Sequence, residues 1–164
     1  MCEKLAKHYQ TAWAEEYARE YLLKNGTDYS FENLLDVAKG QIANEERVTA
    51  NSQAPKSEIA DLKSPIFVDT DMYVMKVWCE FVFGKCHHWI LNRIVERKYD
   101  LYLLCNIDVP WVKDELREYP DLVIREKLYH HYKDIMVNQN VPWVDISGGY
   151  EERLQKAIQS IDKL

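Results

Sequence analysis

Three features that would narrow the class of protein are absent from this sequence: a long apolar run, a signal peptide and a cysteine framework. No apolar stretch approaches the roughly 20 residues that cross a membrane, and the first residues lack the apolar core of a signal peptide. The four cysteines have no C-x-x-C spacing, which argues against structural zinc and against a disulfide framework. We therefore expect a cytoplasmic protein without a membrane segment.

An excess of positive charge is missing as well, because 27 acidic residues outnumber 21 basic residues and the formal net charge is -6. Nucleic acid and anionic membranes repel such a chain at long range, so we expect neither as the main partner. What is present is the composition of one globular domain, with 164 residues of which 47% are apolar and 29% charged. Without repeats or low-complexity segments, residues 1–164 are expected to form a single domain.

The most informative stretch is Ser-Pro-Ile-Phe-Val-Asp-Thr-Asp at residues 64–71. A short apolar run that ends in acids predicts a buried strand of a parallel sheet, with Asp69 and Asp71 at its carboxyl end. Ligands of open α/β sheets bind at that end, and Mg²⁺ is held there by one or two carboxylates together with phosphate oxygens. The alternative is a capped strand end at which Asp71 only starts the next helix.

Helical and strand patterns alternate along the chain, which predicts a three-layer α/β domain with a mostly parallel sheet. Helices are expected at 2–9, 15–23, from 30 to about 50, 72–83, 88–97, 121–136 and 150–164. Strands are expected at 11–14, at 64–71, at 100–106 and at 141–146.

Polar side chains follow three of these strands. Because the carboxyl ends of parallel strands share one edge of a sheet, we expect these side chains to converge. A carboxylate can orient a hydroxyl or take its proton, and an arginine can hold an anion through its planar fork of donors. The alternative for the first group is a solvated first turn of a helix. The groups are Glu16 with Arg19, Asp69 with Asp71, and Asn106 with Asp108.

The connector at 110–120 is charged and carries Arg117, and Arg125 follows eight residues later. Mobile flaps with arginines close over phosphates, where guanidinium groups neutralise developing charge and exclude water. We expect a lid at about 111–125, although a solvated charged loop is the commoner meaning of such a run.

Short motifs are spread over almost the whole chain: Glu-Tyr-Ala-Arg-Glu at 16–20, Gly-Gln at 40–41, Phe-Val-Asp-Thr-Asp at 67–71, Gly-Lys-Cys-His at 84–87, Trp-Val with Asp114 and Arg117, Arg125, and Val-Pro at 141–142. In this order they resemble the nicotinamide-riboside kinase domain of the bifunctional NAD-biosynthesis proteins, within the P-loop kinase group.

The resemblance implies a set of roles. Asp69 would be the Walker B acid on Mg²⁺, with Asp71 beside it. Glu16 and Arg19 would face the riboside, and Arg117 and Arg125 would belong to the lid over ATP. The implied reaction is transfer of the γ-phosphoryl group of ATP to the 5′-hydroxyl of nicotinamide riboside.

One family motif is missing, because G-x-x-x-x-G-K-[ST] occurs nowhere in the 164 residues. In the family the helix corresponding to residues 2–9 follows that loop directly, and the strand before the loop lies in the middle of the sheet. We therefore expect a truncated chain that lacks the central first strand, binds ATP poorly and is inactive as it stands. Two alternatives remain open: a non-catalytic remnant that acts as a binding module, and a kinase for another nucleoside.

Overall fold

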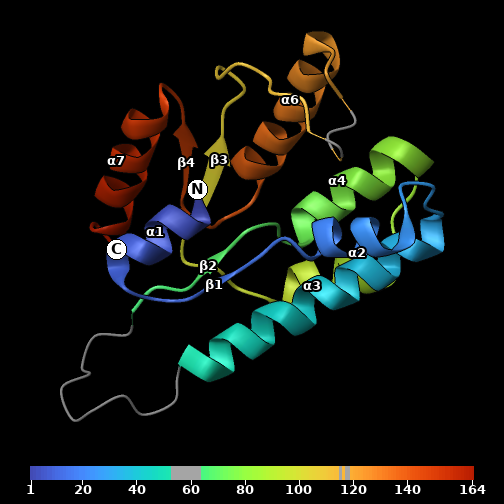
Figure 1. Cartoon of the computed structure of the whole chain (residues 1–164), viewed down its shortest axis with the longest axis horizontal. Helices are drawn as coiled ribbons and strands as arrows, with labels where there is room; N and C mark the ends of the chain where they lie inside the picture. Colours follow the sequence, from blue (N-terminus) through green and yellow to red (C-terminus); the bar gives the residue numbers. More distant parts are fainter. Residues whose placement is uncertain (53–63, 115, 117–118) are drawn as a thin grey trace. The chain divides into compact units, whose positions relative to one another are not determined.

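The structure is a computed structural model that describes residues 1–52, 64–114, 116 and 119–164. Helices and strands alternate along the chain, as the colours of Figure 1 show, and every described strand pair is parallel. The α/β class and the parallel pairing predicted from the sequence are therefore confirmed. The chain divides into two compact units, Met1–Asp71 and Met72–Leu164.

The first unit is built on a short parallel pair of strands, β1 (Trp13–Ala14) and β2 (Phe67–Val68). The backbone N–H of Asp69 donates to the carbonyl oxygen of Ala14 at 2.9 Å, which continues the pairing one residue beyond β2. Helix α1 (Cys2–Tyr9) packs against both strands. The carboxyl end of β2 is thus fixed by backbone bonds.

Two helices complete this unit, α2 (Tyr17–Asn25) and α3 (Phe31–Ser52), and they pack on each other. Helix α2 ends at Gly26, whose φ of 87° is readily adopted only by glycine. Helix α3 begins with a reciprocal cap: the Ser30 hydroxyl accepts from the Asn33 N–H, and the Asn33 side-chain oxygen accepts from the Ser30 N–H.

The buried residues of α3 recur at three-to-four spacing, as in an amphipathic helix. Two of them, Gln41 and Glu45, are polar, although the other buried positions of the helix are apolar. The apolar buried residues are Leu34, Val37, Ala38, Ile42 and Val48.

The second unit contains the parallel pair β3 (Tyr102–Cys105) and β4 (Trp143–Ile146). Helix α6 (Leu122–Asn138) packs against β3 and helix α7 (Tyr150–Ile161) against β4, as Figure 1 shows. The sequence also predicts a buried strand at 100–106 from its apolar run, and this is wrong for β3, whose residues are half-buried and whose last residue, Cys105, is exposed.

Helices α4 (Met72–Phe83) and α5 (His88–Glu96) pack on each other in the same unit, and α4 also packs on α6. The turn between α4 and α5 contains Gly84, with φ 68°, as the sequence predicts for a helix stop. The core of this helical layer includes Met75 and Ile90, both fully buried. Among the described residues, no helix combines the length and apolar content needed to cross a membrane.

Candidate functional site

Asp69 lies directly after β2 and is exposed. Its backbone is held on both sides, since its N–H donates to Ala14 and its carbonyl oxygen accepts from the side-chain amide of Gln41 at 3.2 Å. No hydrogen bond or ion pair to its carboxylate occurs among the described residues. The structure therefore fixes the backbone of Asp69.

The next residue, Thr70, has φ 80°. A β-branched residue with positive φ is a genuine outlier, because its side chain crowds the backbone in this region. Thr70 lies in the short connection between β2, which ends at Val68, and α4, which begins at Met72. Backbone strain of this kind is concentrated at functional sites in proteins.

Glu16 and Arg19 lie at the start of α2, and both are exposed. Glu16 is the N-cap residue, where a carboxylate is favoured by the helix dipole. Its backbone, with φ -65° and ψ 106°, is extended, so the chain turns from β1 into α2 at this point. Both side chains are therefore set by the same junction between strand and helix.

Gln41 connects these two parts of the unit. Its side-chain oxygen accepts from the backbone N–H of Tyr17 at 2.7 Å, and its side-chain nitrogen donates to the carbonyl oxygen of Asp69. The first turn of α2 and the end of β2 are thereby joined through one buried amide. Reasoning from the sequence did not assign Gln41 a role, although a polar residue at a core position of α3 was a signal for it.

A second polar network lies at β3 and β4 in the other unit. The side-chain nitrogen of Asn106 donates to the Tyr129 hydroxyl and to the Asp145 carboxylate, each at 3.0 Å, and the Tyr129 hydroxyl donates to Asp145. Burial alone would raise the pKa of Asp145, but the bonds from Tyr129 and Asn106 lower it overall. Burial and then the bond to Asp145 raise the pKa of Tyr129 to about 12.

Asp108 lies on the loop after β3 and binds residues of the loop before α7. Its carboxylate accepts from the Gly148 N–H at 2.7 Å and from the guanidinium of Arg153, which is 5% exposed. Arg153 also donates to the carbonyl oxygens of Gly148 and Asn106, each at 2.8 Å. The Gly148 bond, followed by the Arg153 bond and charge, lowers the pKa of Asp108. These contacts join the loop after β3 to the start of α7, so the role of Asp108 is structural.

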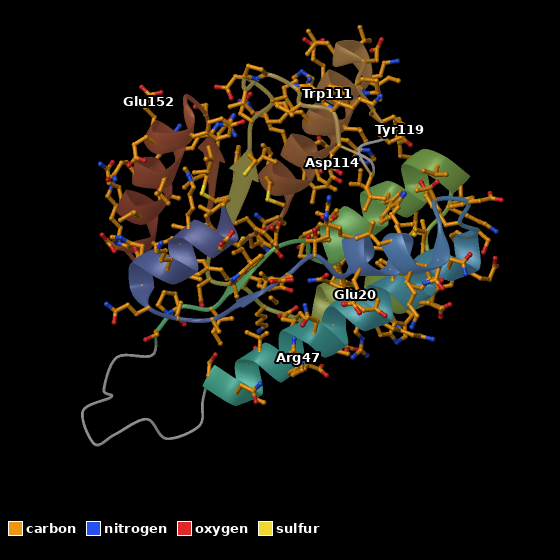
Figure 2. All side chains as sticks on the ribbon, in the orientation of Figure 1. Glu20, Arg47, Trp111, Asp114, Tyr119 and Glu152 are labelled. Atoms are coloured by element: carbon orange, nitrogen blue, oxygen red, sulfur yellow. The ribbon has the colours of Figure 1, made fainter. Side chains whose placement is uncertain are left out.

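The candidate lid is partly described. Arg125 is half-buried on α6, and its guanidinium donates to the carbonyl oxygen of Ile107 at 2.9 Å. Asp114 closes an Asx turn with the Leu116 N–H at 3.1 Å. Figure 2 labels Asp114 on the connector that leads into α6. Arg117, the other arginine assigned to the lid, lies outside the described residues.

The donor set at Asp69 suits Mg²⁺ better than a metal that needs a protein cage. Across the described residues there is no cluster of three His, Cys, Asp or Glu side chains that could hold a metal. Mg²⁺ keeps several waters and commonly uses one or two carboxylates together with phosphate oxygens. A single exposed Asp at the end of a parallel strand meets that requirement once a nucleotide supplies the phosphates.

Parallel strands connected through helices, with ligands bound outside the carboxyl ends of the strands, are typical of nucleotide-binding α/β proteins. The family model for the AAA domain matches residues 1–153, and the chain belongs to this family.

Curated relatives agree with the resemblance found in the sequence. The chain is 24% identical to the trifunctional NAD biosynthesis/regulator protein NadR of Salmonella typhimurium (strain LT2), and 22% identical to the protein of the same name in Escherichia coli (strain K12). Each match covers 100% of this chain and 39% of the relative. The chain thus spans well under half the length of these relatives.

Solved structures establish the likeness of the fold. A crystal structure of NadR protein in complex with NR matches with a TM-score of 0.80 and 20% identity, covering 99% of this chain and 46% of that one. A second, of NadR protein in complex with NAD and AMP-PNP, matches with a TM-score of 0.69 and 21% identity, covering 99% and 44%. The predicted resemblance to the kinase domain of NAD-biosynthesis proteins is confirmed.

Proposed function

We propose that this chain is a nucleoside-kinase-type domain whose substrate is nicotinamide riboside and whose phosphoryl donor is ATP with Mg²⁺. The observation that carries the proposal is the end of β2, where a fixed backbone presents the Asp69 carboxylate beside the strained Thr70. The matches to NadR proteins, among them a structure with NR and one with AMP-PNP, support the choice of substrate and donor.

Asp69 is assigned to the metal. The Asp69 carboxylate would hold Mg²⁺, which would supply positive charge to offset the negative charge that develops during phosphoryl transfer. The contribution of this chain is to hold an acceptor-only carboxylate at a fixed position. Its backbone bonds to Ala14 and Gln41 do that.

The riboside is assigned to the start of α2. Glu16 can accept hydrogen bonds from sugar hydroxyl groups, and Arg19 can donate several from one planar group. Asp71, one residue beyond Thr70, is the third residue assigned to the substrate. Arg125 and Arg117 are assigned to the lid, and the bond of Arg125 to Ile107 occupies only one of the five N–H donors of its guanidinium.

A second candidate is a domain that binds the riboside without transferring phosphate. The 164 residues contain no G-x-x-x-x-G-K-[ST] motif, whose backbone amides and lysine usually hold the phosphates. In this case the start of α2 would still bind a nucleoside, and ATP would have no effect on the protein.

The test is the substitution Asp69→Asn in this chain, which removes the negative charge at nearly constant size. We expect turnover of nicotinamide riboside with ATP and Mg²⁺ to fall roughly 100-fold, because the metal acts on the transferring group. The dissociation constant for riboside, measured by calorimetry, should change less than about threefold, since riboside contacts are made elsewhere.

The matched control is Asp28→Asn, which makes the same charge change at an exposed residue beyond the other end of α2. It should behave like the wild type in both measurements. Riboside binding in the wild type with neither turnover nor a thermal shift on addition of ATP would establish the second candidate, and failure to bind riboside would refute both. Unchanged turnover in Asp69→Asn would remove Asp69 from the metal site.

A further inference from the structure

Helix α3 buries one amide side chain where its pattern calls for an apolar residue. Gln41 is 1% exposed and lies in the row with Leu34, Val37 and Ala38. A buried amide is costly unless its donors and acceptor are satisfied. Gln41 must therefore be explained by the groups that it contacts.

Those groups are backbone atoms of two separate elements. The Gln41 side-chain oxygen accepts from the N–H of Tyr17, the first residue of α2, which has no partner within its own helix. The Gln41 side-chain nitrogen donates to the carbonyl oxygen of Asp69 just after β2. A single side chain thus binds the backbone of Asp69, which is assigned to the metal, and the backbone of Tyr17, which follows the riboside residue Glu16.

The neighbours of Gln41 on α3 reinforce this junction. Asn44, three residues later, donates to the carbonyl oxygen of Glu15 at 3.0 Å, immediately before Glu16. Gly40, one residue earlier, lies so close to the Tyr17 ring that an added Cβ would be 2.0 Å from the nearest ring atom. Three residues of α3 therefore fix the segment from Glu15 to Tyr17.

Only an amide of this length can make both bonds. Glutamate would keep the acceptor for Tyr17 and lose the donor for Asp69, whereas methionine would keep the volume and lose both. Both bonds of Gln41 go to backbone groups, so they do not depend on the side chains of Tyr17 and Asp69. The chemistry of Gln41 is thus suited to aligning two segments.

We propose that Gln41 is a positioning residue that sets Asp69 and the start of α2 in register for phosphoryl transfer. It acts through the backbone of the residues that carry the site and makes no contact with substrate itself. This inference rests on the proposed function, because it assumes that Asp69 serves the metal and that α2 serves the riboside. Transfer between two held groups is sensitive to small errors of placement, which is why such a residue matters.

The experiment compares Gln41→Glu and Gln41→Met with the wild-type chain. Two quantities are measured by titration: the Mg²⁺ concentration that half-saturates binding of AMP-PNP, and the dissociation constant for nicotinamide riboside. Gln41→Glu should raise the Mg²⁺ requirement roughly tenfold, because one bond to Asp69 is lost, while riboside binding stays within about twofold. Gln41→Met should weaken both.

A double-substitution cycle separates positioning from general stability. In the Asp69→Asn background, Gln41→Glu should have no further effect on the Mg²⁺ requirement, because the carboxylate that Gln41 positions has already been removed. The control is Gln159→Glu, the same chemical change at an exposed residue of α7, which should leave both quantities unchanged. Thermal melting checks that each variant is folded, and Gln41→Met carries the test if buried Glu prevents folding.

The possible results are distinct. A lowered melting temperature with both binding quantities unchanged would overturn the positioning role and leave Gln41 a structural residue. Additive effects of Gln41→Glu and Asp69→Asn would overturn the route through Asp69. If the wild type binds neither riboside nor the Mg²⁺ nucleotide, the proposed function fails first and this inference fails with it.

Discussion

At the scale of single residues, Gly40 shows how a missing side chain shapes the site. The Tyr17 ring occupies the space in which a Cβ of residue 40 would lie. Glycine inside a helix costs about 1 kcal/mol relative to alanine, so its presence in the middle of α3 needs a compensating gain. Close packing of Tyr17, whose N–H binds the neighbouring Gln41, supplies that gain.

The substitution Gly40→Ala should therefore destabilise the protein. The new Cβ would force the Tyr17 ring outward and strain the start of α2, and overpacking of this kind costs about 1 to 3 kcal/mol. Thermal melting should show a net loss in spite of the better helix propensity of alanine. In a Tyr17→Ala background the same change should instead stabilise, and a loss of equal size there would contradict this account.

Single residues could be predicted from the sequence where their position follows from the local pattern of a strand or a helix. Asp69 was predicted to follow a short apolar strand, and it lies directly after β2, while its role on a metal stays a prediction. Glu16 and Arg19 were predicted at the start of a helix, and they lie there. Gln41 was missed as a positioning residue, because its role depends on two backbone groups that are 24 and 28 residues away.

At the scale of elements, the start of α3 depends on a few local bonds. Ser30 and Asn33 bind each other's backbone N–H groups, and both bonds are exposed to solvent. Helix α3 then supplies Gly40, Gln41 and Asn44 to the junction between β1 and α2. The cap therefore contributes to the stability of the element on which the site depends.

The substitution Ser30→Ala removes the side-chain acceptor for the Asn33 N–H. We expect a loss of about 1 kcal/mol in the free energy of unfolding, as for other N-caps. Urea denaturation monitored by circular dichroism measures it. Ser30→Asp should retain most of the stability, because aspartate is also a good cap. Unchanged stability in Ser30→Ala would show that the cap does not matter.

Elements that carry their own start and stop signals were well predicted from the sequence. The Ser30 cap, Gly26 and Gly84 all mark helix ends in the structure. Strand lengths were less well predicted, because β1 and β2 have only two residues each, whereas their apolar runs are longer. Pairing with a neighbour decides where a strand ends, and a single run of residues does not contain that information.

At the scale of the whole molecule, the polar network of the second unit links stability to pH. Asp145 has a lowered pKa, so it stabilises the fold above its unfolded pKa of about 3.9 and loses this effect as the pH falls further. Tyr129 has a pKa raised to about 12. The unfolded chain loses that proton near pH 10, so the folded state is weakened between about pH 10 and 12.

We therefore expect the stability of the wild type to fall on the alkaline side of about pH 10. Tyr129→Phe removes the titrating hydroxyl, so its stability should decline less steeply above about pH 10 than that of the wild type. At neutral pH the variant should be less stable than the wild type, because Asn106 and Asp145 each lose a hydrogen-bond partner. Chemical denaturation at several pH values measures both effects. The exposed Tyr150 provides the control, Tyr150→Phe, which should leave the alkaline profile unchanged.

The sequence predicted strands among helices and their parallel pairing, but it did not predict which strands are bonded to each other. Two parallel pairs, β1 with β2 and β3 with β4, form separate sheets among the described residues. Hydrogen bonds between strands depend on partners far apart in the chain, and apolar runs alone do not choose among them. The network of Asn106, Tyr129 and Asp145 was not foreseen for the same reason.

The N-terminus of α7 is already occupied by acids of the same chain. Asp108 accepts from the Gly148 N–H, and Glu152, labelled in Figure 2, accepts from the Gly149 N–H at 2.7 Å. An oxyanion arriving there would have to compete with two tethered carboxylates. Replacing Glu152 by alanine would therefore remove the present acceptor of the Gly149 N–H and leave that amide to water.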